Sequence, residues 1–414
     1  MLEFQKVEII RGGGSCALSL KSAFISLFAV NALTASVALC AQTATDAETS
    51  DYRAPYKLGI PIIAPSGTPG AFDQLAVDHP RLFVHDGRFY LSYLGYDGIS
   101  YQTALAVSDD LLHWERVGMV FTRNQSTNNW DRLGRVVSSY LTPCDFRKNP
   151  ELTRYKGRYW LFYHAYPGEG YEVGAAANGI AWADSPTSLE WHCLDKPVFT
   201  VNPESGHWDS GGLYSICAVP FKDSFLLYYN GKEAGFPWHE QMGIADPEDD
   251  SLTRWRRRPG GPAIPAGDLP WNANFTCGTP LYDSRYGRWM RYFMGLSFEI
   301  GHAYTGVGVS EDGISWRHSP TPVLSASGKG GLDETHAHKT AHAWLNGDLY
   351  LIYCAVRPLK DDAERAKFCR GKAWNEYRCL TIARSRPWTD AERASMGRCR
   401  GRIGKKGEKG RRRF

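Results

Sequence analysis

Short runs of alternating apolar and polar residues recur along the chain, separated by turns rich in glycine and polar residues. In one run, His85-Asp86-Gly87-Arg88-Phe89-Tyr90-Leu91, a tight turn precedes an aromatic-rich strand. Asp-Gly supplies the positive φ that a two-residue hairpin turn needs, and a period of two is typical of a half-buried strand. The same phrase returns at 156–163, 222–229, 286–293 and 346–353. The pattern predicts five β-hairpins in an all-β chain.

A second phrase follows each hairpin: a strand of small and apolar residues, a turn, and then a tryptophan. The tryptophans are Trp114, Trp191, Trp255, Trp316 and Trp388. Hairpin and second phrase form a four-stranded antiparallel unit, which cannot bury both faces alone but can when five units pack radially. The fifth copy stops after its third strand, and a lone strand, 58–63, precedes the first. We therefore predict a single five-bladed β-propeller closed by the N-terminal strand.

The two ends of the chain differ in composition from the repeats. Lys6, Arg11 and Lys21 precede an apolar stretch, 23–41, that ends in small residues, as in an export signal. Cleavage would make the protein secreted or periplasmic; the alternative is a membrane anchor, through the uncleaved stretch or a lipidated Cys40. The expected division is a signal peptide at 1–41, a linker at 42–57, a propeller domain at 58–390 and a basic disordered tail at 391–414.

The net charge of +4 is concentrated at the C-terminus. Residues 395–414 hold nine Lys or Arg and one Glu, a net +8 that leaves −4 for the rest of the chain. Such a distribution does not indicate a basic nucleic-acid-binding domain, and no nucleic-acid partner is expected. Glycines separate the charges of this segment, which has almost nothing apolar to bury, so a solvated tail is expected.

Acidic residues gather where the topology predicts the top of the propeller, at the starts of inner strands and the ends of second strands. Hydrolysis of a glycosidic bond needs one carboxylic acid to protonate the leaving oxygen and one carboxylate to activate water or attack carbon. A single strand-end Asp more often caps a loop or binds Arg, but so many acids on one face favour this chemistry. The acids are Asp73, Asp78, Asp145, Asp209 and Asp333 at inner strands, and Glu169, Glu172, Glu233, Glu240 and Glu299 in loops.

Counting back from the hairpin turns aligns the first and fifth blades. Asp78 lies eight residues before Asp86, and His338 eight before Asn346, so Asp78 and His338 should be equivalent near the axis. His336 and His338 face the same side of one strand, which suits a metal ligand, a general acid or a plain hydrogen-bonding residue. The expected reaction requires no cofactor; His338 is the candidate ligand for a central Ca²⁺ or other ion.

These motifs resemble the five-bladed propeller glycosidases of glycoside hydrolase families 43, 32, 68, 117 and 130. The likeness covers about 58–388, and its last two markers look most like family 117, whose members act on L-configured or anhydro sugars of algal galactans. The markers are Asp78-His79-Pro80, the Asp-Gly-aromatic hairpins, Ser108-Asp109-Asp110-Leu111 before Trp114, His336-Ala337-His338-Lys339, and Tyr353-Cys354-Ala355-Val356-Arg357-Pro358.

The resemblance implies roles for several of these residues. In family 43 the base Asp directly precedes the Pro; here His79 intervenes, so the role passes to Asp78, with Asp73 as rival. Asp209 would tune a pKa, and the acid would be Glu233, Glu299 or, as in family 117, a histidine. The candidate catalytic residues are therefore Asp78, Asp73, Asp209, Glu233, Glu299 and His338, and the candidate substrate contacts His79, Trp208, Trp271, His302 and Lys339.

The expected function is a glycoside hydrolase that releases a terminal sugar from a plant or algal oligosaccharide or polysaccharide. One alternative is a non-catalytic carbohydrate-binding propeller, which would keep the aromatic residues but lack a carboxyl pair. Another is a phosphate-using glycoside phosphorylase of the family 130 kind, for which a basic top face would be needed. Lys148, Lys232 and Lys339 leave that alternative open.

Overall fold

The repeats fold into strands that pair mostly with their neighbours in sequence. The computed structural model of the protein describes residues 43–123 and 127–399. Three antiparallel groups are β2 (Ala76–His85), β3 (Arg88–Tyr96), β4 (Tyr101–Ser108) and β5 (Glu115–Phe121); β6 (Arg135–Tyr140), β7 (Tyr159–Ala165), β8 (Ala177–Ala183) and β9 (His192–Cys193); and β10 (Gly212–Phe221), β11 (Ser224–Lys232), β12 (Glu240–Pro247) and β13 (Trp255–Arg257).

Two further groups complete the sheet arrangement, and the last one uses both ends of the chain. The groups are β14 (Phe275–Asp283), β15 (Arg288–Ser297), β16 (His302–Ser310) and β17 (Arg317–His318); and β18 (His336–Leu345), β19 (Asp348–Pro358), β20 (Glu376–Arg384) and β1 (Tyr56–Lys57). Tyr56 of β1 pairs antiparallel with Arg384, and the Leu58 N–H donates to the Ile382 carbonyl at 2.8 Å. The predicted N-terminal strand therefore lies beside β20, although its regular pairing begins earlier than 58.

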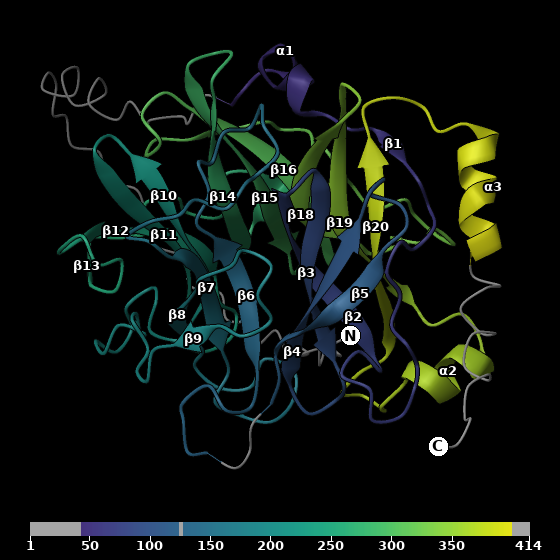
Figure 1. The fold of residues 1–414 in the computed structure, drawn as a ribbon, viewed down its shortest axis with the longest axis horizontal. Coiled ribbons are helices and arrows are strands. Elements are labelled where there is room, and N and C mark those ends of the chain that lie inside the picture. Colours follow the sequence, from purple (N-terminus) through teal and green to yellow (C-terminus); the bar gives the residue numbers. More distant parts are fainter. Residues whose placement is uncertain (1–42, 124–126, 400–414) are drawn as a thin grey trace, which may run out of the picture.

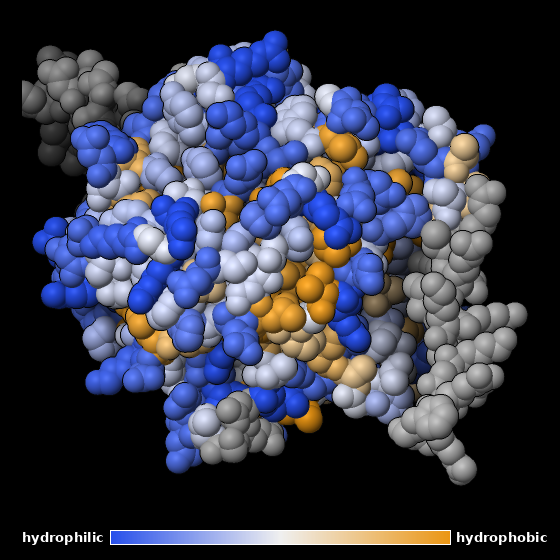
Figure 2. All heavy atoms as spheres, in the orientation of Figure 1, coloured by the Kyte–Doolittle hydropathy of each residue, from blue (hydrophilic) through white to orange (hydrophobic). Residues whose placement is uncertain are grey.

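Consecutive groups contact one another, and the last contacts the first. Single parallel bridges link β12 to β14 and β20 to β2, a two-residue parallel bridge links β16 to β18, and β6 packs against β2 and β10. Figure 1 shows the groups arranged around the middle of the molecule. In Figure 2 hydrophobic residues gather near the middle of the same face, among hydrophilic ones. First strands also contact one another, β2 with β6, β6 with β10, β10 with β14, and β18 with β2, so they lie on the inner side of the arrangement.

Irregular pairing re-aims side chains on these inner strands. In β2 the register shifts between Asp78 and Arg81, and in β18 it shifts at the equivalent place, between His338 and Ala341. A bulge bends a strand and changes which way a side chain points. His79 and Lys339, which directly follow Asp78 and His338, both have φ of 55°. The alignment of Asp78 with His338 made from the sequence therefore holds in the structure.

The chain ends pack more extensively than composition suggested. Where a linker was expected, α1 (Asp46–Thr49) and the 3₁₀ turn Ser50–Tyr52 pack on the domain, and the fully buried Tyr52 donates to Asp283 at 2.8 Å. Where the tail was expected, α3 (Asp390–Cys399) forms, and Glu392 pairs with Arg384 at 2.6 Å. Both anchors use partners on other elements, which composition does not show. The expected signal peptide and residues 400–414 lie outside the described residues.

The second group departs from the sequence-based alignment. Its inner strand β6 ends at Tyr140, so Asp145, which was expected to open this strand, follows it instead. The long connection 141–158 between β6 and β7 explains the error, because counting back from the hairpin assumes a short one. A short helix, α2 (Asp362–Phe368), lies between β19 and β20. Within the part of the chain that the structure describes, no helix is long and apolar enough to cross a membrane.

Candidate active site

A cavity of about 240 Å³ lies among the inner strands and the loops that follow the second strands. All five groups contribute to its wall. Many of the lining side chains are ionisable, which is uncommon for a buried space. The histidine, acidic and basic residues that line the cavity are His79, Arg81, His164, Glu172, Glu240, His336, His338, Lys339, His342 and Arg378.

Glu240 is the carboxyl group with the most perturbed environment in this cavity. It begins β12, where it pairs with Lys232 and, in parallel, with Phe275, and only 7% of it is exposed. Burial and the nearby Glu172 carboxylate together raise the pKa of Glu240 to about 8, against the opposing effect of Lys232 and Lys339. Glu240 therefore carries a proton at neutral pH, as a general acid must.

Glu172 supplies a second carboxyl group to the same wall. It follows Tyr171 in the β7–β8 loop and has φ of 54°, a conformation that costs free energy for a residue with a side chain. Its Oε1 accepts a hydrogen bond from the Tyr101 hydroxyl at 3.3 Å. Such local strain is often found at functional sites. Glu172 and Glu240 thus form the carboxyl pair of the cavity.

Asp78 lies beneath the cavity wall and holds two cations. Its Oδ2 accepts hydrogen bonds from Lys339 Nζ at 2.6 Å and Arg378 Nη1 at 2.7 Å, and its Oδ1 accepts one from the His79 N–H at 2.6 Å. Burial would raise the pKa of Asp78, but Lys339, Arg378 and His338 outweigh it and hold the pKa well below its usual range. Asp78 is therefore ionised, and both of its carboxylate oxygens accept hydrogen bonds.

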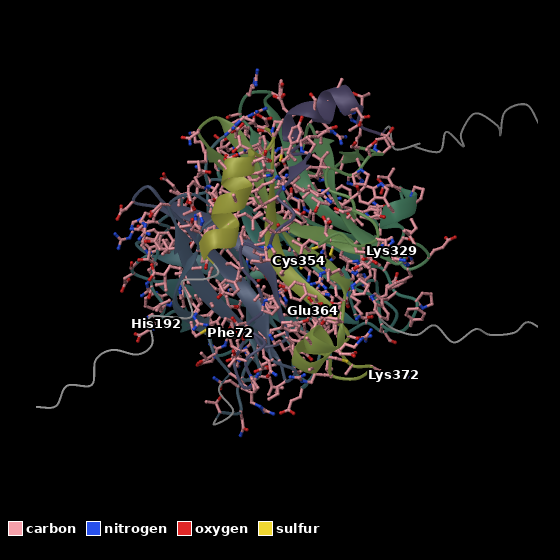
Figure 3. The ribbon with its side chains drawn as sticks, turned by 90° about the vertical axis from the view of Figure 1, so that its right-hand side faces the viewer. Phe72, His192, Lys329, Cys354, Glu364 and Lys372 are labelled. Atoms are coloured by element: carbon pink, nitrogen blue, oxygen red, sulfur yellow. The ribbon has the colours of Figure 1, made fainter. Side chains whose placement is uncertain are left out.

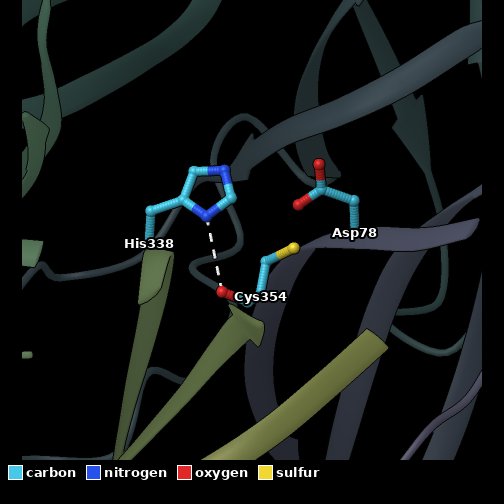
Figure 4. Close-up of side chains that lie close together, drawn as sticks. All are labelled: Asp78, His338 and Cys354. Atoms are coloured by element: carbon cyan, nitrogen blue, oxygen red, sulfur yellow. Dashed lines mark hydrogen bonds between the residues drawn. The ribbon is translucent and has the colours of Figure 1, made fainter. Parts of the chain in front are cut away.

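His338 lies next to Asp78 and Cys354, and one ligand atom from each falls within 4.8 Å of the others (Figure 4). Cys354 lies among the central strands in Figure 3. Burial and Asp78 raise the pKa of the Cys354 thiol well above its usual value, so the free protein carries the protonated thiol at neutral pH. Ca²⁺ requires six or more oxygen ligands, whereas this trio offers one carboxylate already compensated by two cations. The trio by itself therefore lacks the oxygen ligands that Ca²⁺ requires.

Asp209, which the sequence suggested as a catalytic residue, is fully buried outside the cavity wall. Its carboxylate accepts a hydrogen bond from the Tyr229 hydroxyl at 3.1 Å. It also pairs with His207 at 2.5 Å and Arg257 at 2.8 Å. These contacts tie the start of β10 to β11 and β13, which is a structural role.

The same Asp–Tyr–cation arrangement recurs in other groups. Asp131 accepts from Tyr163 at 2.8 Å and Asp333 from Tyr353 at 3.0 Å, and each aspartate also pairs with a cation. Asp73 occupies the equivalent position before β2, is buried, and does not line the cavity. The repetition indicates that these aspartates fasten the inner strands to their groups.

Replacing Asp209 by Ala is expected to destabilise the protein by about 3–5 kcal/mol, because Arg257 and the Tyr229 hydroxyl would lose their buried partner. Thermal unfolding followed by circular dichroism measures the loss. Asp109→Ala is the matched control: its pair with Arg88 at 2.6 Å is exposed, so its loss should cost less than about 1 kcal/mol. Equal shifts in the two variants would contradict the structural role of Asp209.

The remaining candidates from the sequence lie around the cavity rather than in it, apart from His79, His338 and Lys339, which line it. Glu299 is exposed, and Glu233 pairs with His239 at 2.9 Å. Trp208 stacks on Tyr229 and Trp271 on Phe293, which makes them packing residues. The other candidate, His302, bonds through Nδ1 to the Thr335 carbonyl at 2.9 Å.

The sequence analysis placed Glu172 and Glu240 on the same face as Glu233 and Glu299 but chose only Glu233 and Glu299 as candidate acids, whereas Glu172 and Glu240 are the ones that line the cavity. One available signal was position, because Glu240 lies at the start of the third strand of its group, where an inward side chain is expected, whereas Glu233 lies within the loop. The sequence analysis missed Arg378 altogether. Arg378 lines the cavity from β20, and the repeats were aligned there only by the small and apolar residues of their third strands.

No protein-family model matches the chain, and neither does any curated protein sequence. Solved structures do match. A structure named as a complex of BT0996 with RGII is 24% identical, covers 83% of this chain and 94% of its own, and has a TM-score of 0.66. A thermostable family-43 glycoside hydrolase is 15% identical over 79% of this chain and 94% of its own, with a TM-score of 0.52. The protein has the fold of glycoside hydrolases.

A third similar structure is a family 117 glycoside hydrolase produced by the marine bacterium Zobellia galactanivorans, 14% identical over 76% of this chain and 85% of its own, with a TM-score of 0.51. These neighbours have propeller-type folds, in agreement with the strand groups described above. At such low identity the likeness extends to the fold alone. What the cavity does must therefore be argued from its own residues.

Proposed function

We propose that this protein is a glycoside hydrolase that cleaves a terminal glycosidic bond of a plant or algal oligosaccharide or polysaccharide. The observation that carries the proposal is the pair Glu172 and Glu240 in one cavity, with the pKa of Glu240 raised to about 8. Glycosidases need one protonated and one ionised carboxyl group at the same pH, and unequal surroundings provide this.

The proposed architecture is a five-bladed β-propeller in which the five strand groups are the blades. The pairing of β1 with β20 supports closure of the ring by the N-terminal strand. The inner strands β2, β6, β10, β14 and β18 would then surround the axis, which accounts for the contribution of all five groups to one cavity. The apolar stretch 23–41 supports secretion or a periplasmic location.

In the proposed mechanism Glu240 donates its proton to the glycosidic oxygen as the bond to the anomeric carbon breaks. Glu172 supplies the second carboxylate, which either attacks the anomeric carbon or takes a proton from the attacking water. Lys339 and Arg378 offer N–H donors to sugar hydroxyls. Asp78 keeps both cations in place through its two ion pairs.

Asp78 is thus proposed as a positioning residue, although the resemblance to family 43 makes it the base. Asp78→Asn should lower thermal stability by about 3–5 kcal/mol, because Lys339 loses its buried counter-charge and Arg378 keeps only Glu376. It should also lower kcat/KM while leaving the apparent pKa values of the pH–rate profile in place. If the profile instead lost its acidic limb, Asp78 rather than Glu172 would be the base.

The function is tested by incubating the wild-type protein with a panel of oligosaccharides that includes RGII fragments, arabinan fragments and algal galactan fragments, with products followed by NMR. Release of one terminal sugar supports a hydrolase, and the anomer formed first distinguishes inversion from retention. If the protein bound members of the panel but hydrolysed none of them, a carbohydrate-binding propeller would be favoured and the proposal would be overturned.

A glycoside phosphorylase is the second candidate, and Arg81 is the observation in its favour. Arg81 lines the cavity, donates to the backbone carbonyls of Ser138 and Pro80, and forms no ion pair with the residues that the structure describes. An uncompensated guanidinium suits a phosphate ion. The panel is therefore run with and without inorganic phosphate. Formation of a sugar 1-phosphate would assign phosphorolysis in place of hydrolysis.

A further inference from the structure

The proton donor determines on which side of the cavity the leaving group lies. Glu240 delivers its proton to the oxygen that departs with the leaving group, so the remainder of the substrate must extend past Glu240. Glu240 directly follows the β11–β12 loop, 233–239. Aromatic side chains gather in this loop and in the β15–β16 loop beside it.

Phe236, Trp238 and Phe298 contact one another. Ring centroids are 5.3 Å apart for Phe236 and Trp238, 5.3 Å for Phe236 and Phe298, and 5.4 Å for Trp238 and Phe298. Phe298 also contacts Phe275, at 5.5 Å, and Phe275 lines the cavity. The aromatic surface therefore runs from the cavity wall outward, on the side of Glu240.

Phe236 exposes 57% of its surface, the largest value among the exposed large hydrophobic residues that the structure describes. An aromatic ring left in water forgoes most of the free energy that its burial would contribute. Trp238 and Phe298 are partly buried, whereas Phe236 presents more than half of its surface to solvent. Exposed apolar surface next to a cavity is typical of ligand binding.

The loop that carries these rings is fixed rather than loosely placed. At its base the Glu233 carboxylate accepts a hydrogen bond from the His239 N–H at 3.0 Å and contacts Nδ1 of the same residue at 2.9 Å. The Phe298 N–H donates to Asn274 Oδ1 at 2.8 Å. Lys232 Nζ lies 4.2 Å from the centroid of the Trp238 ring. The rings are therefore held before any ligand binds, which lowers the entropic cost of binding.

We propose that Phe236, Trp238 and Phe298, here called the aromatic platform, bind the sugar unit on the leaving-group side of the cleaved bond. This inference rests on the proposed function, because it takes Glu240 as the proton donor. The C–H groups on one face of a pyranose ring pack on aromatic faces, so the preferred substrate is an oligosaccharide with a pyranose next to its terminal sugar. Simple glycosides without that second sugar should be poor substrates.

The test compares two substrates with the same terminal sugar, an oligosaccharide and the methyl glycoside. Phe236→Ala and Phe298→Ala should each lower kcat/KM about tenfold on the oligosaccharide, as expected for the loss of one aromatic contact. On the methyl glycoside kcat/KM should change less than about twofold, because no ring reaches the platform. Val117→Ala, which truncates an exposed apolar residue on β5, is the control and should change neither.

Binding to the same oligosaccharides, followed by tryptophan fluorescence, separates the two proposals. If the wild type bound an oligosaccharide without hydrolysing it, and Phe236→Ala weakened that binding, the aromatic platform would be supported and the hydrolase function would be overturned. Hydrolysis of the oligosaccharide with unchanged kcat/KM in both Phe variants would overturn the platform and keep the hydrolase. Equal losses on the oligosaccharide and the methyl glycoside would also overturn it, since they would indicate damage to Glu240. Absence of binding to every oligosaccharide would overturn both.

Discussion

Replacing Glu240 by Gln is expected to lower kcat/KM by about 10³-fold on oligosaccharides, because the leaving oxygen would depart without a proton. The wild type should lose activity above pH 8, where Glu240, whose pKa is raised to about 8, gives up its proton. In Glu240→Gln the residual activity should show no such alkaline limb. Initial rates from about pH 4 to about pH 10 measure both effects.

The choice of leaving group provides the control for this variant. The 2,4-dinitrophenolate of a 2,4-dinitrophenyl glycoside leaves without protonation, so Glu240→Gln should keep almost the wild-type kcat/KM on this substrate. Equal loss on both substrates would contradict the acid role and indicate a binding or folding defect. The comparison requires no knowledge of the natural substrate beyond its terminal sugar.

Protein stability gives an independent readout of the same residue. The folded-state pKa of Glu240, about 8, lies above its unfolded value of 4.5, so the folded state keeps a proton that the unfolded state releases. The wild type therefore loses stability as pH rises from about 4.5 to 8, by an amount on the order of 4 kcal/mol. Glu240→Gln lacks this loss and should unfold at a higher temperature than the wild type at pH 8.

Replacing Glu172 by Ala is expected to abolish most activity, with a fall in kcat/KM of about 10³-fold or more, because the second carboxylate is lost. The truncated side chain leaves room for a small anion beside the anomeric carbon. Sodium azide should then restore turnover and form a glycosyl azide of inverted configuration, because azide would attack from the face opposite the leaving oxygen. NMR determines that configuration, and a retained one would contradict the role of Glu172.

Asp78→Ala is the matched control for azide rescue. Asp78 has the same functional group and lies under the same cavity, but its oxygens face Lys339 and Arg378. Azide should not restore its activity. Rescue of Asp78→Ala in place of Glu172→Ala would return the second carboxylate role to Asp78, as the resemblance to family 43 implied.

The strand groups were predictable because period-two alternation and Asp-Gly turns report local backbone preferences that the fold keeps. The alignment of Asp78 with His338 followed from equal spacing to equal hairpins. Spacing failed for Asp145, because the β6–β7 connection is longer than in the other groups. Register within a repeat is thus visible in the sequence only where the connections have similar lengths.

The proposed catalytic pair was harder to predict. Acidic residues that hold strands together and acidic residues that face the cavity are of the same type and lie on the same face of the molecule. Asp73 and Asp209 resemble catalytic acids in sequence, yet they occupy the position of the repeated Asp–Tyr–cation arrangement. A tyrosine at matching positions, such as Tyr229 and Tyr353, accompanies that arrangement and could have revealed it. The pKa of Glu240 depends on burial and on Glu172, which only the folded protein brings near.

The pairing of β1 with β20 brings together residues far apart in the sequence, as in the register of Tyr56 with Arg384. Such a contact cannot form during synthesis until β20, which ends at Arg384, has left the ribosome. Until then the edge strands of the incomplete sheets carry unpaired backbone groups that can pair with other molecules. Formation of long-range pairs is also slow. Expression of the protein should therefore depend on chaperone capacity, and removing β1 should promote aggregation before it impairs catalysis.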